Sequence, residues 1–374
     1  MTVTCLSPDG IDEAARLIDP AFLHTPQFSD LSLSRALGRD TVVKVETLNP
    51  IRSFKGRGVN LFLRQAAVAR HVVCASAGNF GQAMAYVGRA RNVPVTVFAA
   101  HDANPNKVAR MRELGAEVVL SGADFDAAKD AARAYAGTRP ECVFVEDGDE
   151  PLIAEGAGSI AVELAPLDLD AIVVPVGNGA LISGIGCWTK ARSPRTRIIG
   201  VCAAGAPATA TSWRTGVPET TGPVRTIADG IAVRVPVPAA VAWMREVVDE
   251  ILLVEEQDIR RALRLVRDTL GLILEPSGAV GIAAALRHDP GVGSLATILT
   301  GGNFSPGLLR ELAPDPSRTD DTAFPAGGGR LAPIEVHFCR AALADPARQS
   351  QLRAIVGATP GKRCHPMRLA CIRG

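Results

Sequence analysis

The sequence has little net charge, few lysines and no long apolar run, and each shortage excludes a class of protein. Forty basic residues oppose 39 acidic ones, which leaves a formal net charge of +1. Without a clustered positive field, neither a nucleic-acid-binding protein nor a protein of anionic membrane surfaces is expected. No apolar run reaches the ~20 residues that a membrane-spanning helix needs. The first residues also lack the pattern of a secretion signal, so the expected location is cytoplasmic.

Cysteine and histidine patterns give no sign of a metal centre. The eight cysteines form no C-x-x-C pair and have no histidines clustered around them. Cys74, Cys187 and Cys202 lie in apolar stretches, where buried, reduced thiols are the usual outcome. No metal site is therefore expected.

Lysine is the rare basic residue, with only six copies, at positions 44, 55, 107, 129, 190 and 362. Arginine keeps its proton, whereas lysine can act as a base or form a Schiff base with a carbonyl group. Any amine chemistry is thus limited to six side chains. Five of them are expected to be ordinary surface residues, and the sixth, Lys55, stands in an unusual turn.

Short runs rich in valine and isoleucine alternate with stretches of helical periodicity. This alternation, with strands apolar throughout, predicts an α/β protein with parallel sheets covered on both faces. The predicted strands are residues 41–46, 71–75, 93–99, 116–120, 142–145, 171–176, 197–202, 250–254 and 295–300. The predicted helices include residues 58–70, 81–91, 105–114, 126–135, 153–164, 256–270 and 277–287. Residues 313–329 are rich in proline, aspartate, threonine and glycine, which indicates a linker or a disordered stretch.

Two of the loops that follow predicted strands have unusual residues, and ligands collect at this edge of open α/β sheets. Lys55 stands between Phe54 and a glycine just before a helix, where the macrodipole opposes a cation. A solvated lysine is the alternative. In Ser76-Ala77-Gly78-Asn79, small residues allow a ligand to approach, and Asn79 either binds it or caps the helix.

Two further loops add a phosphate site and a hydroxyl group. Gly177-Asn178-Gly179-Ala180-Leu181 opens a helix and offers a nest of amides that suits one phosphate group. Its spacing is neither G-x-G-x-x-G nor a P-loop, so NAD or nucleoside-triphosphate binding is not supported. Thr300 precedes two glycines and either contacts a ring nitrogen or forms a turn. Upstream, Glu275 and Ser277 either cap a helix or serve a ligand.

Taken together, these motifs resemble those of the fold-type II pyridoxal-phosphate-dependent enzymes, most closely the serine/threonine dehydratase branch. The matching segments are Ser53-Phe54-Lys55-Gly56-Arg57-Gly58, Ser76–Asn79, Gly177–Leu181, Glu275-Pro276-Ser277-Gly278 and Thr300-Gly301-Gly302-Asn303, within residues 20 to about 310. The resemblance implies two lobes with open, largely parallel twisted sheets and pyridoxal 5'-phosphate in the cleft between them. Residues 1–70 and 149–312 would form a large cofactor-binding lobe, residues 71–148 a small mobile lobe, and residues 313–374 a C-terminal tail.

The resemblance also implies roles for individual residues. Lys55 would hold the cofactor as a Schiff base and, once freed by the substrate, would take its Cα proton. Asn79 would contact the phenolic oxygen of the cofactor ring and Thr300 its nitrogen, with Phe54 and Glu275 also at the cofactor. The phosphate would be bound by amides of Gly177, Asn178, Gly179, Ala180 and Leu181. The substrate carboxylate would be bound by Ser76, Ala77, Gly78 and Asn79.

The implied reaction is β-elimination from a small β-hydroxy amino acid such as L-threonine or L-serine, giving a 2-keto acid and ammonia. A β-replacement or threonine-synthase-like enzyme on the same fold is the alternative, and a non-catalytic binding protein is a more distant one. A homodimer is implied because family members are commonly dimers.

Four departures from the family pattern narrow these expectations. Ala77 stands where serine racemases carry a second acid–base serine, and Phe80 replaces a common histidine. Asn178 and Ala180 interrupt the usual run of four glycines. Residues 200–203, Gly-Val-Cys-Ala, stand where cation-dependent relatives have a glutamate ligand. Racemisation and a divalent-metal site are therefore not expected.

Overall fold

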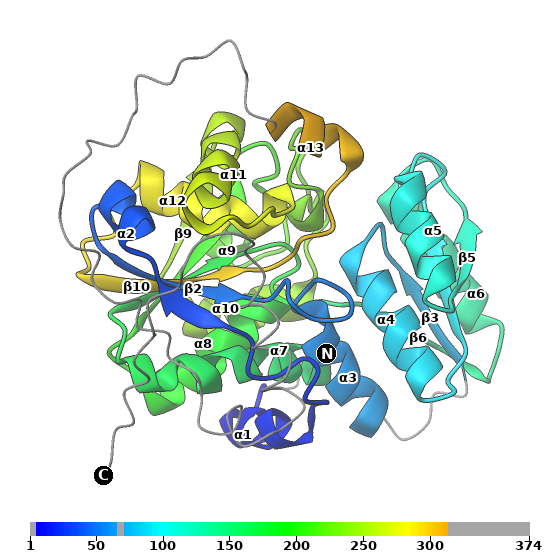
Figure 1. Ribbon diagram of the computed structural model, residues 1–374. Coiled ribbons are helices and arrows are strands. Elements are labelled where there is room, and N and C mark those ends of the chain that lie inside the picture. The colour runs from blue at the N-terminus through cyan, green and yellow to red at the C-terminus, as the bar shows by residue number, and fades with distance from the viewer. Residues whose placement is uncertain (1–4, 66–70, 313–374) are drawn as a thin grey trace, which may run out of the picture. The chain divides into compact units, whose positions relative to one another are not determined.

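The computed structural model describes residues 5–65 and 71–312 (Figure 1). The predicted tail, residues 313–374, lies outside the described residues. Within the described part, no helix combines the length and apolar character needed to cross a membrane. Two separate sheets organise these residues.

The larger sheet has six strands in the order β1-β2-β10-β7-β8-β9. The strands are β1 (Gln27–Ser29), β2 (Asp40–Val45), β7 (Ala171–Pro175), β8 (Arg197–Ala203), β9 (Glu250–Val254) and β10 (Ser294–Leu299). Every neighbouring pair is parallel except β1 with β2. The predicted parallel α/β class is therefore confirmed, with one antiparallel edge strand.

Helices cover both faces of the larger sheet, which explains why its central strands are apolar throughout. Val173 of β7 packs in one apolar core with residues of α11 and α12, whereas Ile172 and Val174 pack in another with residues of α7 and α8. Figure 1 shows these helix pairs on opposite sides of the sheet. The helices of this part are α1 (Pro8–Leu17), α2 (Leu31–Leu37), α7 (Pro151–Leu164), α8 (Ala180–Arg192), α9 (Ala208–Thr215), α10 (Pro238–Val247), α11 (Glu256–Leu270), α12 (Val280–Arg287) and α13 (Pro306–Leu312). The short 3₁₀ helices include η1 (Ala165–Leu167), η2 (Asp229–Ile231) and η3 (Pro276–Ala279).

The smaller sheet has four parallel strands in the order β5-β4-β3-β6. The strands are β3 (His71–Ala75), β4 (Val95–Ala99), β5 (Glu117–Leu120) and β6 (Cys142–Phe144). Helices α4 (Asn79–Ala90) and α5 (Pro105–Glu113) pack in one core with Val72 and Cys74, and α6 (Phe125–Gly137) packs on the opposite face against Val73 and Phe98. Helix α3 (Lys55–Gln65) precedes this sheet in the chain.

All nine predicted strands form, and each observed boundary lies within two residues of the predicted one. Strand β1 was not predicted because three residues are too few to show an alternating pattern. Helix α3 begins at Lys55, three residues before the predicted start. The predicted helix 277–287 begins as the 3₁₀ turn η3, with Pro276 at its first position, and continues as α12 from Val280.

The expectation that the other lysines lie at the surface is wrong for Lys44, Lys107 and Lys129. The exposed fractions of their side chains are 1%, 11% and 11%. The Nζ atom of Lys44 lies 2.5 Å from Glu163 Oε2, and that of Lys129 lies 3.0 Å from Glu146 Oε1. Because these partners are distant in the sequence, the spacing of residues gave no sign of the pairs.

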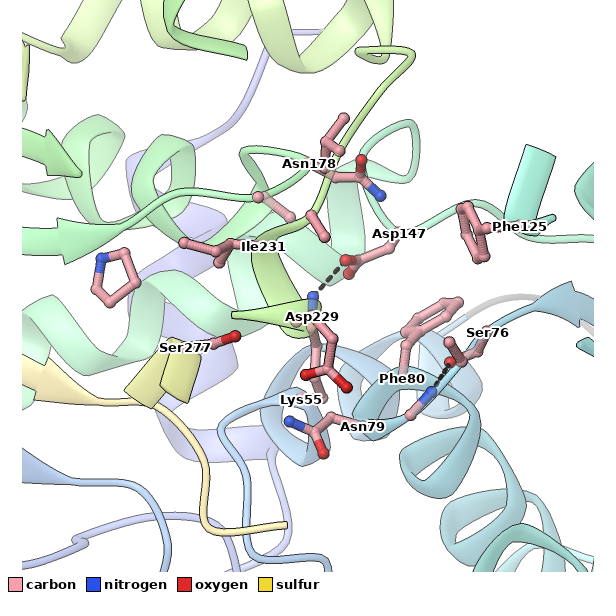
Figure 2. Close-up of a pocket in the computed structure, with 18 of the residues that line it drawn as sticks. Lys55, Ser76, Asn79, Phe80, Phe125, Asp147, Asn178, Asp229, Ile231 and Ser277 are labelled. Carbon is pink, nitrogen blue, oxygen red and sulfur yellow. Dashed lines mark hydrogen bonds and ion pairs between the residues drawn. The ribbon is translucent and has the colours of Figure 1, made fainter. Parts of the chain in front are cut away.

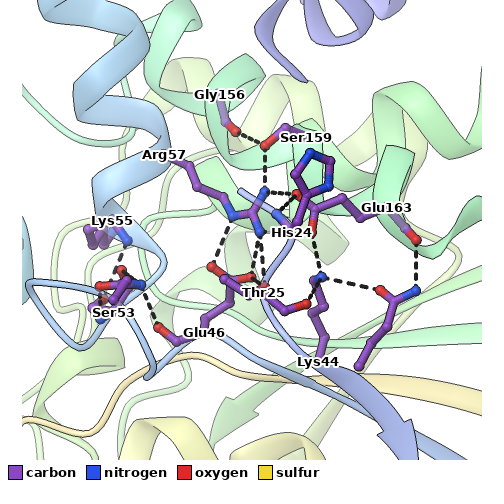
Figure 3. A network of polar contacts seen from close by, with 12 residues as sticks. His24, Thr25, Lys44, Glu46, Ser53, Lys55, Arg57, Gly156, Ser159 and Glu163 are labelled. Atoms are coloured by element: carbon purple, nitrogen blue, oxygen red, sulfur yellow. Dashed lines mark hydrogen bonds and ion pairs between the residues drawn. The ribbon is translucent and has the colours of Figure 1, made fainter. Parts of the chain in front are cut away.

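Figure 3 shows how a buried polar network fixes the start of α3. The guanidinium group of Arg57, fully buried and two residues after Lys55, donates to Glu46 Oε2 at 2.9 Å and to Glu163 Oε1 at 2.7 Å. Arg57 and Lys44 hold the pKa of Glu163 at about 2, against the opposing effect of burial. Arg57 therefore joins α3 to the end of β2 and to α7.

Candidate functional site

A cavity of about 320 Å³ lies where the loops after β3, β6, β7 and β10 meet the start of α3. Figure 2 shows side chains around it that come from loops and helix starts next to both sheets. All thirteen residues that were predicted to serve the site line this cavity: Phe54, Lys55, Ser76, Ala77, Gly78, Asn79, Gly177, Asn178, Gly179, Ala180, Leu181, Glu275 and Thr300. The structure thus brings together five segments of the chain, of which the outermost residues, Phe54 and Thr300, are 246 positions apart in the sequence. The individual roles of these residues stay predictions.

The turn that carries Lys55, residues 53–55, is joined to the end of β10 by backbone contacts. The backbone N–H of Phe54 donates to the carbonyl of Thr300 at 3.1 Å, and Ser53 forms an isolated bridge with Gly301. The Nζ atom of Lys55 donates to Oδ2 of Asp147 and lies 4.7 Å from the centre of the Phe54 ring. The solvated-lysine alternative is wrong, because the side chain of Lys55 is 16% exposed and paired inside the cavity.

Asn79 begins helix α4, yet its side chain does not cap that helix. The N-cap position is Gly78, without a side-chain cap, while the Ser76 hydroxyl accepts from the N–H of Gly81 at 2.9 Å. The amide of Asn79 instead donates to Glu275 Oε1 at 2.5 Å and accepts from Asn303 Nδ2 at 2.8 Å. The capping alternative for Asn79 is therefore wrong, and its amide belongs to the wall of the cavity.

The loop before α8 presents free amides to the cavity. Helix α8 begins at Ala180, and its N-cap, Gly179, has φ +93° and provides no side-chain cap. Such a φ favours glycine. Within this loop only Gly179 has a positive φ, so Asn178 and Ala180 stand at positions that accept side chains. The backbone amides at the start of a thirteen-residue helix are suited to bind an anion.

Glu275 and Ser277 carry buried polar atoms that have no partner among the described residues. Glu275 is 2% exposed, and burial raises the pKa of its carboxyl to about 7, partly offset by Lys107. Its Oε2 atom and the Ser277 hydroxyl are unpaired there. Glu275 does not cap η3 with its side chain, so the capping alternative is wrong for it too. The Thr300 hydroxyl donates to the carbonyl of Ser277 at 3.4 Å.

The sequence reasoning missed a set of charged residues in the cavity. Asp147 follows β6 at the same edge that carries the predicted loops, so the edge rule already pointed to it. Lys107 of α5 lies 2.5 Å from Asp229 Oδ2. Arg234 lies 2.6 Å from Asp126 Oδ2. The last two pairs join helices of the smaller sheet to the loop around η2, and nothing in the spacing of these residues indicated them.

Within residues 5–65 and 71–312, no three histidine, cysteine, aspartate or glutamate side chains are grouped so as to hold a metal ion. The expectation of no metal site stays a prediction.

Known proteins with the same arrangement were identified by sequence and by structure. The family model described as "Pyridoxal-phosphate dependent enzyme" matches residues 18–301. L-threonine ammonia-lyase of Geobacter sulfurreducens is 38% identical over 293 residues, which are 75% of this chain and 70% of that protein. The processed threonine deaminase isoform 2 of Solanum lycopersicum has a TM-score of 0.74 and 29% identity, covering 83% of this chain and 89% of that one. Maize serine racemase has a TM-score of 0.77 and 27% identity, covering 82% and 97%.

Proposed function

Because the chain belongs to the pyridoxal-phosphate dependent enzymes, we propose that it is an ammonia-lyase for a small β-hydroxy amino acid, L-threonine or L-serine. The reaction is β-elimination, with a 2-keto acid and ammonia as products. The observation that carries this proposal is the position of Lys55. Its amine opens into the cavity that is also lined by the amides before α8 and by the side chains of Asn79 and Thr300.

The groups that line the cavity fit pyridoxal 5'-phosphate. An amine suits its aldehyde, uncapped helix amides suit its phosphate, and the unpaired Ser277 hydroxyl and Glu275 Oε2 are buried atoms that a polar ligand can satisfy. We assign Lys55 to the aldehyde and residues 177–181 to the phosphate. We further assign Asn79 to the phenolic oxygen, Thr300 to the ring nitrogen, and Phe54 and Glu275 to the remaining walls.

In this arrangement each side chain has a distinct task. When bound, the cofactor supplies an electron sink for the negative charge that develops at the substrate's Cα. Lys55, released by the incoming substrate amine, takes the Cα proton on its Nζ atom. The loop Ser76–Asn79, at the start of the twelve-residue helix α4, binds the substrate carboxylate through backbone N–H groups. Thr300, a neutral hydroxyl, leaves the ring nitrogen largely unprotonated, which favours prompt loss of the β-hydroxyl over transamination.

We also propose that the two sheets mark two lobes, residues 1–70 with 149–312 and residues 71–148. The smaller lobe would carry Ser76–Asn79 and close over the substrate, which excludes water from the reacting groups. The bond between Asn79 and Glu275 and the pair of Lys107 with Asp229 support this, because both join the lobes at the cavity. A homodimer, on the family resemblance alone, and a cytoplasmic location, on the sequence pattern of the first residues, complete the proposal.

Two other reactions are possible on the same cofactor. Likeness to maize serine racemase favours racemisation, but Ala77 provides no acid or base at the position where the racemases have serine. β-Replacement, or a threonine-synthase-like reaction, shares every cofactor residue with the lyase. The products distinguish the three reactions.

The test is product analysis with the cofactor-loaded full chain and L-serine or L-threonine as the only substrate. Ammonia and a 2-keto acid in equal amounts support the lyase. D-Serine as the main product would indicate a racemase. Product that forms only with an added nucleophile, or only from a phosphorylated substrate, would indicate β-replacement or threonine-synthase-like chemistry and contradict the proposal.

A further inference from the structure

The cavity contains a site that suits an ammonium group, and the Nζ ammonium group of Lys55 occupies it. The Lys55 Nζ atom donates to Asp147 Oδ2, and it lies 4.7 Å from the centre of the Phe54 ring and 6.0 Å from that of Phe80. A carboxylate together with aromatic faces is a favourable environment for a cation. Figure 2 shows Lys55 pointing at Asp147, with Phe80 beside the pair.

Asp147 has unused capacity to accept hydrogen bonds. It is 9% exposed, and its Oδ1 atom is buried without a partner among the described residues. Two other carboxylates of the cavity have cationic partners, Lys107 for Asp229 and Arg234 for Asp126, whereas Glu275 has only the neutral amide of Asn79 and likewise keeps one unpaired oxygen. Because a buried carboxylate without a partner is costly, Asp147 needs a donor whenever the Lys55 amine is bonded to another group.

Asp147 lies where the substrate can provide the hydrogen-bond donor that this carboxylate needs. In the proposed function, on which this inference rests, Lys55 Nζ reaches the substrate's Cα, so Asp147, bonded to Nζ, lies close to the groups that Cα carries. The substrate carboxylate belongs with the amides of Ser76–Asn79, which leaves the side chain as the group that can meet Asp147. A cationic side chain would replace the lysine ammonium in the same environment, whereas a second carboxylate would be repelled.

We propose that Asp147 is a specificity-determining residue that selects amino-acid substrates whose side chain carries an ammonium group and excludes those whose side chain ends in a carboxylate. Neutral substrates such as serine should bind with intermediate affinity. Among β-hydroxy amino acids, a 2-amino-3-hydroxy acid with a terminal amine should bind most tightly and 3-hydroxyaspartate most weakly.

Binding of three amino acids without a leaving group on Cβ tests this without turnover. The probes are L-2,4-diaminobutyrate, L-2-aminobutyrate and L-aspartate, which are similar in size and carry a positive, a neutral and a negative side chain. Their dissociation constants are measured from the visible absorption of the cofactor-loaded enzyme. For the wild type we expect the affinity to fall in that order, with about a tenfold step on each side of the neutral probe.

The variant Asp147→Asn keeps the shape and removes the charge. Diaminobutyrate should lose about tenfold in affinity relative to aminobutyrate, and aspartate should gain about tenfold. Asp149→Asn is the matched control, since Asp149 is exposed on the same loop and does not line the cavity, and it should keep the wild-type ratios. An equal change for all three probes, or no change, overturns the proposal, because Asp147 would then act only on Lys55 or on the shared α-amino group.

Two features keep the test decisive. If Asp147→Asn fails to fold or to take up cofactor, the order of the three affinities in the wild type decides alone. In that case the proposal is contradicted if the wild type binds aspartate with the same affinity as diaminobutyrate. Because no probe is turned over, the binding order is obtained even if serine and threonine yield no keto acid. Failure of the proposed lyase activity and failure of this inference are therefore separate results.

Discussion

Nδ2 of Asn79 donates a hydrogen bond to Oε1 of Glu275 at 2.5 Å, joining residues 196 positions apart at the wall of the cavity. The acceptor is a buried carboxyl whose pKa is raised to about 7, mainly by burial. Its charge therefore changes near neutral pH, next to an amide that we assign to the cofactor. The hydrogen bond between Asn79 and Glu275 therefore connects the stability of the fold with the charge of a carboxyl group in the cavity.

The raised pKa of Glu275 predicts a pH-dependent loss of stability. Its usual value is 4.5, so the folded state holds the proton more tightly than the unfolded chain does. The stabilising contribution is complete below about pH 4.5, falls as the pH rises and is lost above about pH 7, a change of about 3 kcal/mol. Urea unfolding of cofactor-free wild type and Glu275→Gln at pH 5 and pH 8 should show this difference between the two proteins. Glu141→Gln, at an exposed carboxylate, should follow the wild type, and parallel profiles for wild type and Glu275→Gln would contradict the assignment.

Removing the Asn79 amide should weaken cofactor binding and the fold together. Asn79→Ala leaves Glu275 Oε1 and the amide of Asn303 without one of their partners, at a cost of about 1–3 kcal/mol of stability. Cofactor titrations followed by absorption should show affinity reduced by about tenfold or more. Asn106→Ala, at an exposed position of α5, should change neither quantity. Wild-type cofactor affinity in Asn79→Ala would exclude the role assigned to this residue.

Gly179 should be more sensitive to a methyl group than its neighbours. In Gly179→Ala an alanine would have to adopt φ +93°, and its Cβ would lie 3.0 Å from the Met244 sulfur. We therefore expect the free energy of unfolding to fall by about 1–2 kcal/mol and the cofactor to bind more weakly. Gly271→Ala is the matched control: φ is +65° at the end of α11 and no atom lies within 4 Å. It should lower the free energy of unfolding similarly but leave cofactor affinity unchanged. If both variants bind cofactor equally well, the loop before α8 is not the phosphate site.

The Arg57 network should dominate the stability around α3. Arg57→Met leaves the buried carboxylate of Glu46 without its cationic partner and Glu163 with Lys44 alone, which costs about 3–5 kcal/mol. Arg110→Met removes the exposed pair with Glu113 and should cost less than about 1 kcal/mol. Urea unfolding measures both values. Equal losses in the two variants would show that the buried network contributes no more than a surface pair.

A property of parallel sheets allowed the sequence to place the loops of the site within each sheet. Carboxyl ends of neighbouring parallel strands meet at one edge, so the loops after β2, β10 and β7 converge in the larger sheet, and those after β3 and β6 converge in the smaller one. Lys55 could be selected because lysine is rare and its turn precedes a helix. Local signals were thus enough to predict nine of the ten strands in the described part of the chain, and the loops that follow them, whereas their meeting in one cleft was implied by the family resemblance.

Long-range pairing of charges could not be predicted in the same way. Lys44 looks like any polar residue in a strand, and only the fold reveals Glu163 beside it. The pairing of Asp147 with Lys55 likewise depends on how the loop after β6 lies against α3. Short-range spacing carries no information about either pair, so the sequence analysis placed Lys44 at the surface. It also left Asp147 out of the site, although the position of Asp147 after β6, next to β3, indicated that edge of the smaller sheet.

The most direct test of the account measures 2-oxobutyrate and ammonia released from L-threonine by the cofactor-loaded wild type and by Lys55→Ala. We predict equal amounts of the two products from the wild type and a rate lower by about a thousandfold in Lys55→Ala, because the base that takes the Cα proton is lost. Lys190→Ala, at a half-buried lysine outside the cavity, should retain the wild-type rate. Undiminished release by Lys55→Ala, or no release by the loaded wild type from threonine or serine, would contradict the account.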